Sequence, residues 1–230
     1  MGHAGENGAQ RHGGRQATAR TIAGRVALVV ALAAAITSYE PLNHPTASVH
    51  VLRTPLDAAL PFVPLLAIPY LLFLPFVLGT LLLFALREWA RFRTLALAVI
   101  FAALAADLAF IAFQTYVARP SVVGNDLGAR LVRAIYAGDQ PYNGFPSLHV
   151  AFSMLCLIAY ARWRRAYALA ALPLVAAIIA ATVLIRQHYL ADVAGGLALA
   201  GLAYWVSARL SEPRKSATSL AMRVRITGEG

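Results

Sequence analysis

Residues 144–150 read Gly-Phe-Pro-Ser-Leu-His-Val, and residues 186–192 read Arg-Gln-His-Tyr-Leu-Ala-Asp. Each stretch places one histidine, His149 or His188, at the start of a hydrophobic segment. The two histidines are separated by about the length of one helical hairpin, so we expect them at the same face of a membrane. Asp192 follows His188 by four residues and therefore lies one turn further along the same helix face. Polar groups are costly at the edge of apolar spans, so this gathering indicates a functional site.

The composition around these stretches is that of a membrane protein. The chain has 230 residues, of which 60% are hydrophobic and 13% are charged, far more apolar than a soluble domain. The net charge of +10 fits the positive-inside rule better than nucleic-acid binding. The single cysteine, Cys156, excludes a disulfide framework.

Hydropathy predicts an all-α polytopic protein with six transmembrane helices. A proline-punctuated stretch before the second span predicts a short helix there. In the long loop 119–146, Leu127, Leu131 and Ile135 recur at helical spacing beside arginines, which predicts a helix lying in the membrane interface. The six spans are expected at about residues 22–39, 65–86, 94–118, 147–161, 166–185 and 189–208.

The ends of the chain frame this membrane domain. We expect a disordered cytoplasmic tail over 1–20, the six-span domain over 21–210 and a basic cytoplasmic tail over 211–230. With both ends inside, 15 Lys and Arg residues fall on the inner side and 5 on the outer side. This predicts a multi-pass protein of the plasma (inner) membrane with the histidines on the outer face.

The first motif is suited to binding phosphate. Ser147 follows Pro146 and precedes an apolar run, so it is expected to cap a helix whose first turn contains His149. Helix N-termini attract phosphate through free N–H groups and the helix dipole. Arg119 and Arg186, on the same predicted face, would add charge-assisted hydrogen bonds to phosphate oxygens.

The second motif is suited to nucleophilic catalysis. Asp192 can bond one nitrogen of His188 and leave the other nitrogen free to attack phosphorus. His149, when protonated, can give its proton to the leaving oxygen. We therefore predict His188 as nucleophile, Asp192 as its orienting group and His149 as acid.

Several further polar residues are candidates for accessory roles. Asp107 lies near the middle of the third predicted span, with Gln114 expected on the same helix face, and it is either a functional carboxylate or a packed, paired one. Tyr142 and Asn143 precede the first motif and are expected to line a head-group pocket. Gly195, Gly196 and Gly201 predict close packing of the last helix.

The two motifs together resemble the type 2 phosphatidic acid phosphatase (PAP2) superfamily. The resemblance rests on Pro-Ser-Leu-His at 146–149 and on His188-Tyr189 with Asp192 and Gly196 downstream. It implies a six-span enzyme that acts on lipid phosphate esters through a phosphohistidine, with the same three catalytic roles. Arg119-Pro120 resembles the Arg-Pro that closes the family's first motif, so Pro120 is an accessory candidate.

Three positions depart from the usual family pattern. Ala112 and Thr182 stand where Lys and Arg are usual, and Leu148 replaces a glycine. The motif forms look more like the inositol phosphorylceramide synthase and sphingomyelin synthase branch, whose members transfer a phospho-head-group between lipids. The resemblance therefore implies a phosphotransferase, inositolphosphotransferase-like, with a lipid phosphate phosphatase acting on phosphatidate or polyprenyl (pyro)phosphate as the alternative.

Two other classes of protein remain open. Two histidines and a carboxylate can form a facial metal triad, but neighbouring arginines argue against a cation there. A non-catalytic lipid-binding protein would not need the His188–Asp192 pair. We expect lipid metabolism chemistry without cofactor or metal, a membrane lipid phosphoester as substrate, the bilayer as partner and no nucleic acid.

Overall fold

The computed structural model describes residues 4–211, with side chains from residue 21 onward. The described chain is built from helices, joined by loops with two isolated bridge pairings. The α-helices are α1 (Ala4–Thr37), α2 (Pro55–Ala59), α3 (Ala67–Leu71), α4 (Phe73–Arg87), α5 (Trp89–Ala112), α6 (Leu127–Gly138), α7 (Leu148–Trp163), α8 (Arg165–Leu184) and α9 (Leu190–Ser211). Two 3₁₀ turns, η1 (Glu40–Leu42) and η2 (Pro64–Leu66), precede α2 and α3 respectively.

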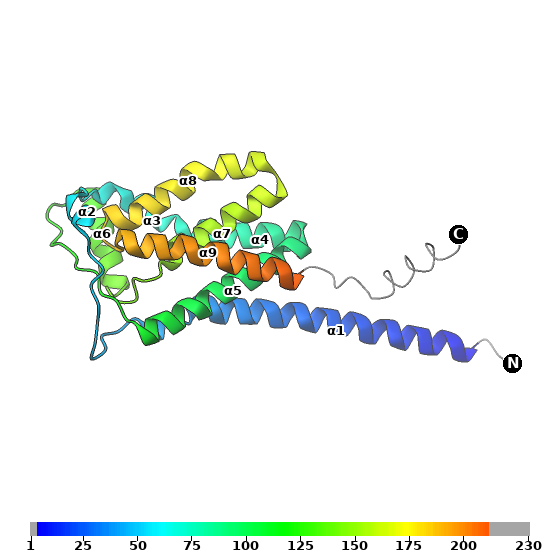
Figure 1. Ribbon diagram of the computed structural model, residues 1–230. Helices are drawn as coiled ribbons and strands as arrows, with labels where there is room; N and C mark the ends of the chain where they lie inside the picture. The colour runs from blue at the N-terminus through cyan, green and yellow to red at the C-terminus, as the bar shows by residue number, and fades with distance from the viewer. Residues whose placement is uncertain (1–3, 212–230) are drawn as a thin grey trace, which may run out of the picture.

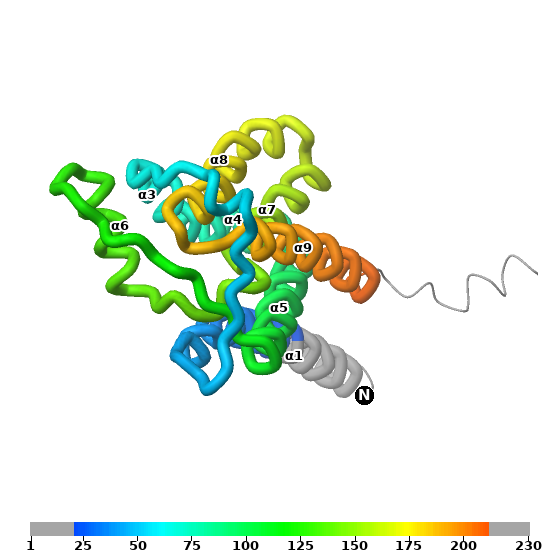
Figure 2. Tube along the Cα trace, turned by 60° about the vertical axis from the view of Figure 1, so that its left-hand side comes forward, coloured from blue at the N-terminus to red at the C-terminus, as the bar shows by residue number. Residues whose placement is uncertain are grey.

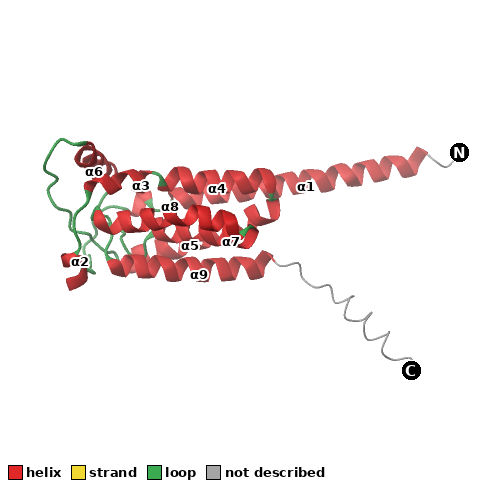
Figure 3. Ribbon diagram, turned by 90° about the horizontal axis from the view of Figure 1, so that it is seen from above, coloured by secondary structure: helices red, strands yellow, loops and turns green. Residues whose placement is uncertain are grey.

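The long helices form one bundle (Figure 1). The start of α1 and the end of α9 lie at one end of the bundle, while α2 and α6 lie at the other. The long loops gather at the α2 and α6 end (Figure 3). The first turns of α7 and α9 therefore open onto a loop-rich end, where polar side chains have room to form a site.

Five helical segments of the described chain are long and apolar enough to cross a membrane. They are Thr21–Leu42, Pro64–Arg87, Trp89–Ala112, Arg165–Leu184 and Leu190–Ser211. The apolar α7 has 16 residues, fewer than the roughly 20 that a straight span needs. The prediction of an all-helical, multi-pass protein is confirmed, and the count of six spans stays a prediction.

The segment Pro64–Arg87 is a stack of η2, α3 and α4 instead of one straight helix. Pro64, Pro69 and Pro75 explain the interruptions, because a proline lacks the N–H that continues a helix. Short helical turns do occur in this proline-punctuated stretch, as η2 and α3. The further short helix α2 lies upstream of it and begins with a capping box between Thr54 and Asp57.

The third span ends earlier than predicted, at Ala112 instead of 118. Thr115 and Tyr116 instead form bridges with His50 and Tyr142, as suits a β-branched and aromatic run. Gln114 consequently lies in a loop, where its side chain bonds the segment 42–46, and not on the helix face of Asp107. The prediction that Gln114 shares a helix face with Asp107 is wrong.

Helix α5 is the centre of the bundle and packs against α1, α4, α7 and α9. Its inward face is rich in alanine, which allows neighbouring backbones to come close. Ala96, Ala98, Ala102, Ala103 and Ala106 are all fully buried. The amphipathic α6 lies beside α3 at the edge of the bundle (Figure 2). Leu131 and Ile135 pack there, whereas Leu127 is exposed; the helix is confirmed and its place in a membrane interface stays a prediction.

Glycines bring α9 against the loop that precedes α7. A Cβ on Gly196 would lie 2.6 Å from the carbonyl oxygen of Ser147, and one on Gly195 would lie 2.5 Å from the ring of Phe145. Close packing is thus confirmed at these two positions. It is wrong for Gly201, where a Cβ would meet nothing within 4 Å.

The predicted tails are not tested. The backbone of α1 is helical from Ala4, within the predicted tail 1–20, but the side chains of that tail lie outside the described residues. Apart from Ser211, the last residue of α9, the basic tail 211–230 also lies outside them.

Candidate active site

The first turns of α7 and α9 are tied to one another. Ser147 caps α7 as predicted, its Oγ accepting a 3.4 Å hydrogen bond from the N–H of Val150. The Ser147 N–H donates to the carbonyl oxygen of Asp192 at 3.1 Å. Ser147 is fully buried, so the structure places its side chain in the helix cap and not on a cavity wall.

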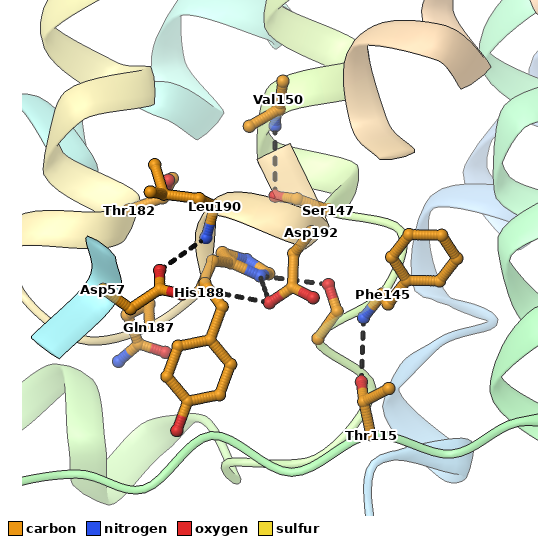
Figure 4. A network of polar contacts seen from close by, with 12 residues as sticks. Asp57, Thr115, Phe145, Ser147, Val150, Thr182, Gln187, His188, Leu190 and Asp192 are labelled. Atoms are coloured by element: carbon orange, nitrogen blue, oxygen red, sulfur yellow. Dashed lines mark hydrogen bonds and ion pairs between the residues drawn. The ribbon is translucent and has the colours of Figure 1, made fainter. Parts of the chain in front are cut away.

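His188 and Asp192 lie together (Figure 4), but His188 lies in the loop before α9 and not, as the four-residue spacing predicts, on the same helix face. The Nδ1 atom of His188 is 3.5 Å from Oδ2 of Asp192 and 3.1 Å from the carbonyl oxygen of Gly144. Oδ2 of Asp192 also accepts a 2.8 Å hydrogen bond from the N–H of Tyr189. With a carbonyl beside it, Nδ1 carries the proton, and Nε2 keeps the lone pair that a nucleophile needs.

Gly144 leaves little room for a side chain beside this contact. A Cβ at position 144 would lie 3.0 Å from Oδ2 of Asp192 and 3.2 Å from Oγ1 of Thr115. Thr115 in turn accepts a hydrogen bond from the N–H of Phe145 at 2.9 Å (Figure 4). The loop before α7 is thereby fixed where its carbonyl meets the imidazole.

His149 faces His188 from the first turn of α7. The two ring centroids are 5.7 Å apart, with an angle of 61° between the ring planes. On its other sides His149 contacts the rings of Tyr70 and Phe73, with centroids 4.5 and 4.4 Å away. Aromatic packing therefore holds the His149 ring in place. The gap between it and the His188 ring is about the size of one small chemical group.

Arg119 binds the loop that carries His188. Its guanidinium donates to the carbonyl oxygen of Asp139 at 2.6 Å and to Oε1 of Gln187 at 2.7 Å, and it lies 4.6 Å from the ring of Tyr136. Burial lowers the pKa of Arg119, but arginine remains charged at any physiological pH. Because Arg119 binds Gln187, the residue before His188, its positive charge lies next to the loop that carries the histidine.

The structure does not bring Arg186 to the histidines. Its guanidinium donates to the carbonyl oxygens of Asp57 at 2.6 Å and Leu60 at 2.5 Å, and its φ is +58°. Arg186 and Pro120 line a separate cleft of about 330 Å³, which Arg53 and Arg119 also line. Arg186 thus holds the α2 segment against the His188 loop.

A cavity of about 310 Å³ lies beside the two histidines. Tyr142 and Asn143 line it, and Asp107 does not; that it binds a lipid head group stays a prediction. Asp107 is only 8% exposed and one of its oxygens, Oδ1, has no hydrogen-bond partner among the described residues. Apolar residues from α1, α4, α5 and α7 form the other walls. They are Ile36, Phe73, Leu74, Val77, Phe110, Leu148 and Phe152.

Sequence reasoning missed two carboxylates. Asp57 is fully buried and accepts a 2.8 Å hydrogen bond from the N–H of Leu190, the first residue of α9 (Figure 4). The capping-box pattern of Thr54 and Asp57 could have identified Asp57 from the sequence. Asp139 lines the cavity, and its Oδ1 accepts a 2.7 Å hydrogen bond from Nδ2 of Asn43, 96 residues away. No local pattern points to that contact.

Among the residues that the structure describes, no group of three or more His, Cys, Asp or Glu side chains is arranged to hold a metal ion.

The comparisons with known proteins give one match. A family model described as the PAP2 superfamily matches residues 35–206, a range that contains both histidine motifs and α4 to α8 entire. No curated protein and no solved structure matches the chain.

Proposed function

Because the chain belongs to the PAP2 superfamily, we propose that it is an integral membrane enzyme that works on a lipid phosphoester through a phosphohistidine on His188. One observation carries the proposal: Nδ1 of His188 lies against the Gly144 carbonyl and Asp192, which leaves Nε2 as the nucleophile beside the cavity.

In the first step, Nε2 of His188 attacks phosphorus, and the bond from phosphorus to the leaving oxygen breaks. His149 gives its proton to that oxygen. The positive charge that develops on the His188 imidazole is stabilised by the Gly144 carbonyl and by Asp192, which is fully buried. No metal or cofactor is needed for these steps.

The phosphate is held at the start of α7. The N–H groups of its first turn and the helix dipole attract an anion, and Arg119 supplies the positive charge. Ser147 contributes by capping the helix. Arg186 contributes by positioning the His188 loop through Asp57 and Leu60.

The lipid tail enters sideways from the membrane. The apolar cavity walls come from α1, α4, α5 and α7, and Ile36 of α1 lines the same space as Leu74 and Val77 of α4. An acyl chain bound there would keep its phosphoester near the histidines while its end stays in the bilayer.

We favour transfer of a phospho-head-group over release of phosphate. A phosphomonoester carries nearly two negative charges, whereas a phosphodiester carries one and needs fewer cations. The family's usual cations are absent at Ala112 and Thr182, and Thr182 is buried with its hydroxyl bonded to Ile179. A lipid hydroxyl bound at the site competes with water through its high effective molarity.

Hydrolysis of phosphatidate or a polyprenyl (pyro)phosphate is the alternative, and membership of the superfamily fits it equally. Purified protein incubated with radiolabelled phosphatidic acid or phosphatidylinositol, with and without dioctanoylglycerol, separates the two. New labelled lipid from the diester supports transfer. Rapid release of inorganic phosphate from the monoester, with the diester untouched, supports hydrolysis. The matched control is His188→Ala, and unchanged turnover in EDTA would exclude the metal-dependent rival.

A further inference from the structure

One wall of the cavity carries polar groups that the proposed first step does not use. Asn43, Asp139, Asn143 and Gln187 all line the cavity, although they come from three separate loops. The three amide side chains are nine-tenths buried or more, with exposed fractions of 9%, 7% and 5%. They belong to the interior of the site and not to a solvated surface.

Each amide is held at one end and unpartnered at the other. Nδ2 of Asn43 donates to Asp139, Oδ1 of Asn143 accepts from Gln114, and Oε1 of Gln187 accepts from Arg119. The opposite atoms, Oδ1 of Asn43, Nδ2 of Asn143 and Nε2 of Gln187, are buried without a hydrogen-bond partner among the described residues. Buried polar atoms without partners are costly, and the three residues line one cavity, so a ligand bound there would satisfy them.

The free groups are one acceptor and two donors, and none carries a charge. Such a set suits a neutral hydroxyl-bearing molecule better than a phosphate, because a hydroxyl both donates and accepts hydrogen bonds. A carboxylate stands beside this set, since Asp139 shares a hydrogen bond with Asn43 at 2.7 Å. A neutral hydroxyl next to a carboxylate is the arrangement that general-base catalysis requires.

We propose that Asp139 is a further catalytic residue, the base that takes the proton from the hydroxyl group that attacks the phosphohistidine. The unpartnered amides of Asn43, Asn143 and Gln187 hold the molecule that carries this hydroxyl. The inference rests on the proposed function, because it assigns the acceptor side of the same site.

The chemical step balances as follows. The hydroxyl oxygen, from water or from an alcohol, forms a bond to phosphorus, and the bond between phosphorus and Nε2 of His188 breaks. The electron pair of that bond returns to the imidazole. The hydroxyl proton moves to the Asp139 carboxylate, so the products are a phosphate or phosphodiester and the restored histidine.

The surroundings of Asp139 suit a base. Partial burial raises the pKa of its carboxyl, while the charge of Arg119 and the hydrogen bonds from Asn43 and Tyr70 oppose that rise. A raised pKa strengthens the carboxylate as a base, and the opposing groups keep it ionised. Tyr70 also stacks on His149, and Asp139 lines the same cavity as both histidines.

The test separates formation of the phosphoenzyme from its breakdown. Purified enzyme in detergent is mixed with radiolabelled phosphatidic acid or phosphatidylinositol, with and without dioctanoylglycerol, and quenched in alkali, where phosphohistidine survives. Asp139→Asn should form labelled protein at the wild-type rate and accumulate it, while turnover falls by about 10²–10⁴-fold. Hydroxylamine, a nucleophile that needs little deprotonation, should discharge the trapped label.

The matched control is Asp126→Asn, the same change at the opposite end of α6. Asp126 caps α6 outside the cavity, and asparagine caps equally well, so its labelled protein should not accumulate. In the wild type, the label leaves the protein either in water alone or only when dioctanoylglycerol is added, and this identifies the acceptor.

Wild-type turnover in Asp139→Asn would overturn the proposal, as would loss of labelling at unchanged melting temperature, since Asp139 would then act in the first step. An active wild type that never labels, in any variant, would instead refute the phosphohistidine of the proposed function. If Asp139→Asn does not fold, Asp139→Glu takes its place: slowed breakdown with normal formation supports the assignment, and wild-type breakdown contradicts it.

Discussion

Oδ1 of Asp57 accepts a 2.8 Å hydrogen bond from the N–H of Leu190, although the two residues are 133 positions apart. Leu190 is the first residue of α9, so Asp57 satisfies a donor that the helix leaves unpaired. The same α2 segment receives the guanidinium of Arg186 on two carbonyl oxygens. The loop that carries His188 is thus held by the α2 segment at both of its ends, through Arg186 before the histidine and Leu190 after it.

Replacing Asp57 should loosen this brace. Asp57→Ala removes a cap and leaves a buried N–H without a partner, which typically costs about 0.5–2 kcal/mol. We expect a lower melting temperature in detergent, measured by thermal shift, and a parallel loss of activity. A melting temperature equal to wild type would show that Asp57 does not support α9.

Asp57 should also make stability depend on pH. Burial alone would raise the pKa of its carboxyl, but hydrogen bonds from Thr54 and Leu190 and the charge of Arg186 hold it below the ordinary value of 3.8. The contribution to stability is therefore present above that value and is lost as the pH falls through the depressed one. Acid titration of the melting temperature should show this loss in wild type and not in Asp57→Asn.

The two arginines should respond differently to substitution. Arg119→Gln removes the positive charge proposed to bind the phosphate and should lower kcat/KM, since hydrogen bonds to charged groups are each worth about 1.5–3 kcal/mol. Arg186→Gln removes two bonds to carbonyl oxygens and should lower melting temperature and activity together. If Arg186→Gln loses activity but melts at the same temperature as wild type, Arg186 binds the phosphate and does not merely position the loop.

The role of His149 depends on the leaving group. As the acid of the first step, it matters most when the leaving oxygen is basic. His149→Ala should therefore be most harmful with lipid alkoxide leaving groups and least harmful with nitrophenolate, which needs little protonation. Assays of both esters with one preparation decide the matter, and equal damage with both would reverse our assignment of acid and nucleophile.

Much of this site could be read from residues close together in sequence. The four-residue step from His188 to Asp192, the Ser147 cap and the hydropathy of the spans are local patterns, and local patterns dictate helices. The bonds that position the site join distant loops instead, as with Asp57 to Leu190 and Asn43 to Asp139. The sequence also holds no indication that Arg186 points away from the histidines, because its left-handed backbone conformation is set by the turn into α9.

The orientation in the membrane can be tested through the loop before α6. Cys156, the natural cysteine, is buried, so an introduced cysteine reports alone. Asn125→Cys should react with an impermeant reagent in intact cells, whereas Arg165→Cys, at the other end of the bundle, should react only after lysis. The reverse pattern would place the site inside and contradict the charge-based topology.

The most direct test of the central claim is to find the phosphate on the protein. Wild-type enzyme is quenched in alkali during turnover of a radiolabelled lipid phosphoester and mapped by mass spectrometry. We predict an acid-labile, alkali-stable phosphoryl group on His188, absent from His188→Ala, which should also lose about four orders of magnitude in kcat. Label on another residue, or sustained turnover by His188→Ala, would contradict the account.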